Sequence, residues 1–164
     1  MRHVELNNQL MQRGADGFFQ LEKDREAVEV FMEEVREKTM PFADWKERLD
    51  YLIANDYYEN VYERYTPEQV EEIIRLVHEI PFQFASYMAI SKFYKDYALK
   101  TNDKAYYLEQ YPDRVAIVAL SLGQGDFERA KRLAVSMMEQ RLQPATPTFL
   151  NAGKSRRGEM VSCF

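Results

Sequence analysis

Apolar side chains recur every three or four positions along most of the chain, which is the spacing of a helix with one buried face. The pattern is clearest in residues 66–80, whose apolar stripe consists of Val70, Ile73, Ile74 and Val77. Thr66 is suited to cap this helix, Pro67 fits the first helical position, and Gln69 completes a capping box. We therefore predict a helix that begins at Thr66.

A second amphipathic pattern covers residues 126–141, with Asp126 as its cap. Its predicted buried face consists of Phe127, Ala130, Leu133, Ala134, Met137 and Met138. Weaker helical patterns cover residues 22–38, 42–56, 84–100 and 111–125. Between Val4 and about Arg141 the sequence predicts six or seven helices with short connections.

The character of the sequence changes at Leu142. Pro144 and Pro147 argue against a helix, while Thr146 and Thr148 favour extended backbone. Residues 146–150 are therefore predicted as a short strand, residues 151–158 as a turn and residues 159–164 as a second strand. The predicted fold is mainly α, with β structure beginning close to the end of the chain.

Length and charge narrow the class of protein. The chain has 164 residues, enough for one domain with a core or for one piece of a larger protein. Its formal charge of −5 argues against nucleic acid as a partner. The first residues contain no apolar core of a signal peptide, and the longest apolar run, Val115 to Leu120, is far too short to cross a membrane. We expect a cytoplasmic protein without membrane contact.

The tripeptide Gly153-Lys154-Ser155 resembles the second half of a phosphate-binding loop. That loop requires a first glycine at the position of Thr148, and a helix immediately after the motif. The side chain of Thr148 hinders close wrapping around a phosphate, and the residues that follow read as a strand. We reject the phosphate loop. The basic residues Lys154, Arg156 and Arg157 fit either a solvated turn or contacts with a phosphate-bearing ligand or a partner chain.

Cys163 is the single cysteine, so the chain cannot form an internal disulfide. Spacing alone leaves two readings open: a small buried apolar side chain, or a thiol that reacts together with a second thiol elsewhere. The two histidines, His3 and His78, show no ligand spacing. We predict no metal in this chain and a structural or solvent-exposed position for His78.

The segment LQPATPTFLNAGKSRRGEMVSCF closely resembles the entry to the catalytic barrel in the large subunit of ribonucleotide reductase, class Ib type. Other stretches resemble the amino-terminal region of the same family, in order and across nearly the whole chain: FQLEKDREAVEVF, ERLDYLIANDYYE, FYKDYALKTNDKAYYLE and DRVAIVALSLGQGD. The sequence looks most like enzymes of Gram-positive bacteria or their phages.

This resemblance implies a helical amino-terminal region followed by the opening strands of an incomplete ten-stranded α/β barrel. Residues 1–57 would correspond to a partial remnant of the regulatory ATP-cone, residues 58–141 to a helical domain, and residues 142–164 to the start of the barrel. Residues 159–164 would then form an opening barrel strand that carries Cys163.

The resemblance also implies radical reduction of ribonucleoside diphosphates to deoxyribonucleoside diphosphates for DNA replication. Cys163 matches the member of the reducing cysteine pair that gives a hydrogen atom toward the 2′ carbon and ends in a redox-active disulfide. Ser162 matches a residue that contacts the substrate. Thr146 and Thr148 match the stretch beside the substrate's phosphates, and which of the two makes the contact stays open.

The family further implies partners and cofactors outside this chain. These are a small subunit with a dimetal-tyrosyl radical, a redoxin reductant, nucleotide effectors, a second copy of the complete subunit and the rest of the large subunit itself. The radical cysteine, the second reducing cysteine and most of the effector site belong to family sequence beyond Phe164. We expect the chain alone to be inactive, and to be a truncated chain, the product of an interrupted gene or half of a split enzyme.

A different class of function is a noncatalytic helical module that binds a nucleotide or a protein. The last nineteen residues separate the two hypotheses, because a binding module does not need TPTFLNAG followed by Ser-Cys, whereas the enzyme's barrel does. Deleting residues 146–164 would raise solubility and leave partner binding intact if the module hypothesis holds.

Overall fold

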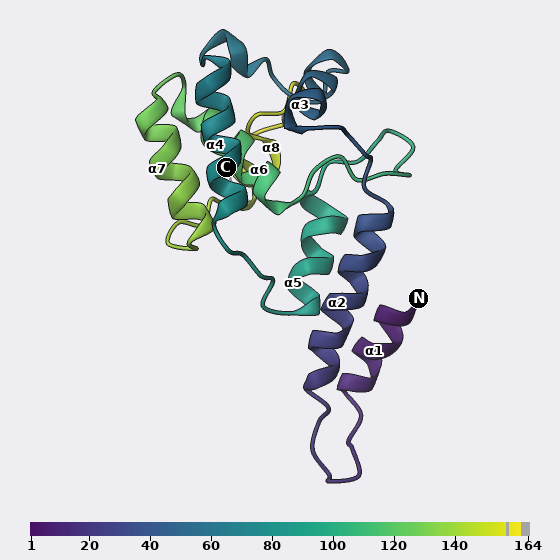
Figure 1. Ribbon diagram of the computed structural model, residues 1–164. Helices are drawn as coiled ribbons and strands as arrows, with labels where there is room; N and C mark the ends of the chain where they lie inside the picture. The colour runs from purple at the N-terminus through teal and green to yellow at the C-terminus, as the bar shows by residue number, and fades with distance from the viewer. Residues whose placement is uncertain (157, 162–164) are drawn as a thin grey trace. The chain divides into compact units, whose positions relative to one another are not determined.

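The computed structural model describes residues 1–156 and 158–161; more than half of these residues are helical, and most of the others lie in turns and loops (Figure 1). In chain order the elements are α1 (Arg2–Leu10), α2 (Glu22–Glu37), α3 (Trp45–Ala54), the 3-10 turn η1 (Val61–Glu63), α4 (Pro67–Glu79), α5 (Tyr87–Lys92), the π-helical turn η2 (Phe93–Tyr97), α6 (Tyr111–Gly123), α7 (Phe127–Met138) and α8 (Thr146–Asn151). Within the described residues, β pairing is limited to isolated bridges. The prediction of a mainly helical protein is confirmed.

The chain folds into two compact units, each assembled from two separate stretches of sequence. Unit 1 contains residues Met1–Met40 and Gln83–Glu109, and unit 2 contains Pro41–Phe82 and the residues from Gln110 onward. Each unit therefore builds its core from segments that lie far apart in the sequence.

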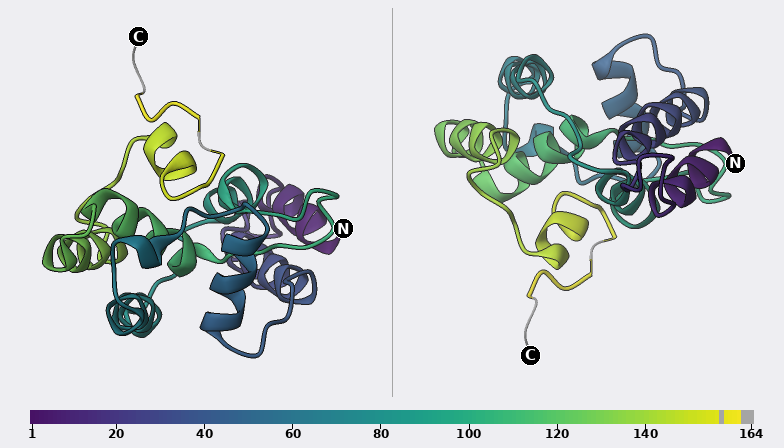
Figure 2. Two further views of the ribbon diagram at one scale, coloured as in Figure 1. Left: turned by 90° about the horizontal axis from the view of Figure 1, so that it is seen from above. Right: turned by 90° about the horizontal axis from the view of Figure 1, so that it is seen from below.

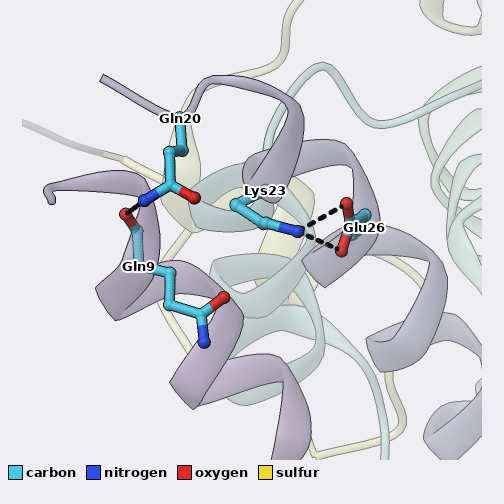
Figure 3. Close-up of polar contacts among 4 residues, drawn as sticks. All are labelled: Gln9, Gln20, Lys23 and Glu26. Atoms are coloured by element: carbon cyan, nitrogen blue, oxygen red, sulfur yellow. Dashed lines mark hydrogen bonds and ion pairs between the residues drawn. The ribbon is translucent and has the colours of Figure 1, made fainter. Parts of the chain in front are cut away.

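In unit 1, α1 lies beside α2 and α5 packs against α2 (Figure 1). His3 of α1 is buried, and its Nδ1 lies 2.7 Å from Glu34 Oε1 of α2. The loop between α1 and α2 is tied back by Gln20, whose Nε2 donates to the carbonyl oxygen of Gln9 across 3.4 Å (Figure 3). Next to it, Lys23 forms a partly buried ion pair with Glu26, with Nζ and Oε1 2.9 Å apart (Figure 3).

The helix predicted over residues 84–100 forms in two parts. Ser86 caps α5 by accepting a hydrogen bond from the amide of Ala89, 3.2 Å away. The helix then widens into η2, in which the amide of Ala98 donates to the carbonyl of Phe93 across 2.9 Å, one residue farther than in a regular turn. Phe93 and Tyr94, adjacent in sequence, are both buried in the aromatic core of this unit.

In unit 2, α4, α6 and α7 lie side by side and bury their apolar faces against one another (Figure 1). The predicted capping box of α4 is present: the amide of Gln69 donates to Thr66 Oγ1 across 3.3 Å, and the amide of Thr66 donates to Gln69 Oε1 across 3.1 Å. The whole predicted stripe of α4 is buried, namely Val70, Ile73, Ile74 and Val77. Asp126 caps α7 as predicted. On α7, Phe127 and Leu133 are only half-buried, because they lie at the edges of the apolar face.

The end of the chain differs from the prediction. Residues 146–151 form the short helix α8 and not a strand, and residues 158–161 are in no regular element. Figure 2 follows the chain from α7 into α8, drawn in yellow. Pro147 lies in the first turn of α8, where its missing N–H costs nothing because no amide there has an intrahelical acceptor. Ser162, Cys163 and Phe164, at the end of the second predicted strand, lie outside the described residues.

Candidate functional site

Helix α8 carries both threonines predicted to lie near a substrate. Thr146 is exposed at the start of the helix, and Thr148 is half-buried. The hydroxyl of Thr148 donates a hydrogen bond to the carbonyl oxygen of Met160 across 3.0 Å, and Asn151 Nδ2 donates to the carbonyl oxygen of Glu159 across 2.9 Å. The helix thus holds the returning chain by two side-chain hydrogen bonds to backbone.

The other predicted site residues are described only in part. Ser162 and Cys163 lie outside the described residues, so the structure does not test whether they meet the threonines. In the basic cluster, Lys154 is half-buried and Arg156 is exposed, while Arg157 lies outside the described residues. The roles assigned to these side chains stay predictions.

Gly153 follows α8 and packs directly on α6. Its φ of +77° lies in the left-handed region, and a β-carbon at this position would stand 2.5 Å from Cγ1 and 3.0 Å from the carbonyl oxygen of Ile117. The carbonyl oxygen of Gly153 accepts from the amide of Glu59 across 3.0 Å. The amide of Ser155 donates to the carbonyl oxygen of Tyr57 across 3.1 Å. The loop after α8 is therefore fixed between α6 and residues 57–59.

A buried arginine reaches the same loop from α6. Arg114 has no exposed surface, and its Nη2 donates a hydrogen bond to the carbonyl oxygen of Ala152, the residue that ends α8. The guanidinium carbon lies 5.8 Å from the centre of the Tyr58 ring, a cation–π arrangement. The positive charge thus sits at the carboxyl end of a short helix, where a cation is favourable.

Asp113, the residue before Arg114 on α6, connects α6 to α3 and α4. Asp113 Oδ1 of α6 lies 2.8 Å from Arg48 Nη2 of α3 and 2.9 Å from His78 Nε2 of α4, and Asp113 Oδ2 accepts from the amide of Gln110 across 2.8 Å. Burial by itself would raise the pKa of Asp113, but the charge of Arg48 and the hydrogen bonds from His78 and Gln110 hold it below its usual value. His78 was predicted to be structural or solvent-exposed; its side chain is 44% exposed and contacts this carboxylate.

An aromatic contact anchors α8 in the core of unit 2. Phe149 is 4% exposed, and its ring lies 5.9 Å from that of Tyr111. Tyr111 in turn stacks on Phe82 with ring centres 4.0 Å apart. Burial raises the pKa of the Tyr111 hydroxyl, so the group stays neutral at physiological pH. This apolar anchor explains how a six-residue helix keeps its place.

Asp113 and Arg114 were not predicted from the sequence as residues of this site. Their signal was present, because the two opposite charges stand immediately before the longest apolar run of the chain, Val115 to Leu120. Charged residues at the start of a helix that is buried on all sides must find partners inside the protein. The partners themselves, Arg48 and the loop after α8, come from distant segments and follow only from the tertiary structure.

The described residues have no arrangement typical of a resident metal or of a membrane span. No three His, Cys, Asp or Glu side chains gather closely enough to hold a metal ion in residues 1–156 and 158–161. None of the helices described is long and apolar enough to cross a bilayer. Helix α8 and the loop after it can form hydrogen bonds through threonine hydroxyls and backbone amides.

Comparison with known proteins identifies relatives of the whole chain. Residues 3–82 match the family model for the ribonucleotide reductase N-terminal domain, and residues 83–157 match the model for the ribonucleotide reductase all-alpha domain. The chain is 53% identical over 163 residues to the ribonucleoside-diphosphate reductase NrdEB subunit alpha of Bacillus subtilis (strain 168), an alignment that covers 98% of this chain and 15% of the relative.

Two further relatives carry the same activity in their names. The ribonucleoside-diphosphate reductase subunit alpha of Bacillus subtilis (strain 168) is 48% identical over 163 residues, which is 98% of this chain and 23% of the relative. The corresponding subunit of Mycoplasma genitalium is 50% identical over 143 residues, 86% of this chain and 20% of the relative. The chain spans less than a quarter of the length of each of these relatives.

Proposed function

The chain belongs to the ribonucleotide reductase large-subunit family, and on that premise we propose that it contributes to the reduction of ribonucleoside diphosphates to deoxyribonucleoside diphosphates. It corresponds to the amino-terminal region of the alpha subunit. The names of its relatives and the class Ib pattern of its barrel-entry segment support this reaction, which supplies precursors for DNA synthesis.

Cys163 is proposed as one of two thiols that reduce the substrate. In the overall reaction the two thiols lose two protons and two electrons, the ribose 2′ hydroxyl leaves as water, and the sulfurs end as a disulfide. A redoxin then reduces that disulfide. The second reducing cysteine and the cysteine that carries the thiyl radical are assigned to the rest of the large subunit.

Thr146, Thr148 and Ser162 are proposed to bind the substrate. Thr146 is the better candidate for direct contact with the diphosphate, because its side chain is exposed at the start of α8. The hydroxyl of Thr148 already donates its proton to the carbonyl oxygen of Met160. A hydroxyl has one proton, so Thr148 in this arrangement offers a phosphate no donor except its backbone amide.

The hydrogen bonds between α8 and residues 159–160 support the proposal independently of sequence similarity. The side chains of Thr148 and Asn151 bind the backbone of Met160 and Glu159, so the two halves of the barrel-entry segment are held together. A substrate site that uses both α8 and the residues after Val161 requires this proximity. A helical binding module would have no use for it.

The remaining parts of the proposal concern partners and organisation. We place the chain in the cytoplasm, in a complete large subunit that forms a homodimer and receives its radical from a small subunit with a dimetal-tyrosyl centre. Nucleotide effectors regulate that assembly. The expected boundaries, a partial ATP-cone remnant at 1–57, a helical domain at 58–141 and the start of the ten-stranded barrel at 142–164, stay predictions.

A domain exchange tests the proposed function. Residues 1–164 replace the matching segment of the Bacillus subtilis alpha subunit that is 48% identical, and the chimera is assayed with its small subunit, a dithiol reductant and a ribonucleoside diphosphate. We expect the chimera to form deoxyribonucleoside diphosphate, and the 164-residue chain alone to form none. A folded chimera that binds the small subunit but gives no product would overturn the proposal and favour the noncatalytic module.

A further inference from the structure

Arg114 is the largest fully buried side chain in the described part of the molecule, and it points at backbone. Its Nη2 donates to the carbonyl oxygen of Ala152, where α8 ends. Carbonyl groups in the last turn of a helix have no amide partner within the helix, so a cationic donor stabilises them. This contact fixes the point at which the chain leaves α8.

A second residue of the same helix face supports the same loop. Ile117, one turn after Arg114 on α6, lies against Gly153 so closely that a β-carbon there would overlap it. Two adjacent backbone positions, Ala152 and Gly153, are therefore defined by two side chains one turn apart on α6. Such a pair sets both the position of the loop along the axis of α6 and its direction.

The opposite side of the loop is held by residues 57–59. Tyr58 pairs with Lys154 as an isolated antiparallel bridge, with hydrogen bonds from Glu59 to Gly153 and from Ser155 to Tyr57 on either side. The ring of Tyr58 also faces the guanidinium of Arg114. The arginine thus contacts both the loop and the segment that holds the loop from the other side.

We propose that Arg114 is a positioning residue that sets the register of the segment from α8 to Met160 on α6. This inference rests on the proposed function, because that segment leads to Ser162 and Cys163 and carries Thr146. Arg114 acts through the backbone of Ala152 and is assigned no contact with substrate. Its role would be to hold the barrel-entry residues at one fixed position along α6 of unit 2.

A positioning role for Arg114 predicts that its loss affects the loop after α8 alone, whereas a general role in the core predicts an effect on all of unit 2. Arg114→Met removes the charge and the donors but keeps an unbranched side chain, so the loop should open while the helices stay closed. Arg114→Lys keeps the charge and a donor for the Ala152 carbonyl. Arg48→Met serves as the matched control, since it removes another buried cation of unit 2, one whose guanidinium pairs with Asp113.

Amide hydrogen exchange on the 164-residue chain measures the effect directly. The amides of Glu59 and Ser155 report the loop, and helical amides of α4 and α7 report the rest of unit 2. We expect Arg114→Met to speed exchange at Glu59 and Ser155 by roughly tenfold to a hundredfold relative to α4 and α7, the range for losing a hydrogen bond to a charged group. Arg114→Lys should restore most of the protection, and Arg48→Met should leave the ratio of loop to helix rates unchanged.

Two results would overturn the inference. One is an equal rise of exchange in the loop, α4 and α7, which would assign Arg114 to the core in general. The other is unchanged exchange at Glu59 and Ser155. If Arg114→Met gives no folded chain, the same ratio measured in Tyr58→Leu decides, because this change removes the ring that faces the guanidinium and keeps the buried charge. No turnover is measured, so failure here is distinct from failure of the proposed function.

Discussion

The hydroxyl of Thr148 donates a hydrogen bond to the carbonyl oxygen of Met160, 3.0 Å away and 12 residues later in the chain. Together with the bond from Asn151 to Glu159, it makes α8 the support for the last described residues. Thr148, one of the two threonines predicted to lie beside the substrate's phosphates, therefore also has a structural partner.

Replacing Thr148 by valine tests this support. The two side chains have nearly the same shape, so Thr148→Val removes the hydrogen bond and leaves the carbonyl of Met160 without its donor. We expect a loss of about 1 kcal/mol in the free energy of unfolding and faster amide exchange over residues 158–161. Thr101→Val, which removes a hydroxyl contact with Asp103 in unit 1, is the control. Unchanged exchange over residues 158–161 in Thr148→Val would contradict the assignment.

Gly153 and Gly17 separate the effect of backbone conformation from the effect of packing. Both have positive φ, +77° and +81°, but a β-carbon at Gly17 has no atom within 4 Å, whereas one at Gly153 overlaps Ile117. Gly17→Ala should cost about 1 kcal/mol, the strain of a left-handed alanine. Gly153→Ala should cost about 2–4 kcal/mol, because overpacking is added. Urea unfolding of both variants checks this, and equal losses would show that α6 yields to the extra methyl group.

The Asp113 carboxylate predicts an acid-sensitive unit 2. Its pKa in the folded chain is held below the unfolded value of about 4, so its stabilisation is complete above that value and is lost as the pH falls through the folded-state pKa. Asp113→Asn should cost about 3–5 kcal/mol at pH 7 by leaving Arg48 without its carboxylate, and the difference from the parent chain should shrink in acid.

Urea unfolding between pH 7 and pH 2.5 tests this behaviour. Glu79→Gln, which removes one exposed carboxylate beside Arg75, controls for the change in net charge. A constant difference between Asp113→Asn and the parent chain across this range would mean that the carboxylate does not titrate with folding.

The helices of this protein follow from local rules that the sequence displays. The capping box at Thr66 and the cap at Asp126 are read directly, because the residues that make each cap stand within one turn of the helix they start. The stripe of α4 is buried throughout, because a helical period of apolar residues leaves one face that only a core can cover. These features depend on neighbours in sequence and not on distant contacts.

Helix α8 and the loop after it show the limit of prediction from local sequence patterns. Pro147 argues against a helix in general, but it is tolerated in a first turn, and the burial of Phe149 beside Tyr111 decides in favour of α8. The contacts of Arg114 join α6 to a loop 38 residues later. A pattern within one element predicts that a buried charge needs a partner, but it does not identify the partner.

We propose that Cys163 reduces a ribonucleotide within a completed large subunit, and the other proposed roles depend on this one. The most direct measurement is a single turnover of the pre-reduced chimera with a radical-loaded small subunit and no external reductant. We predict that the parent chimera forms deoxyribonucleoside diphosphate, that Ser155→Ala forms an equal amount, and that Cys163→Ser forms none while it still binds substrate and small subunit. Deoxyribonucleotide formation by Cys163→Ser equal to that of the parent would contradict the claim.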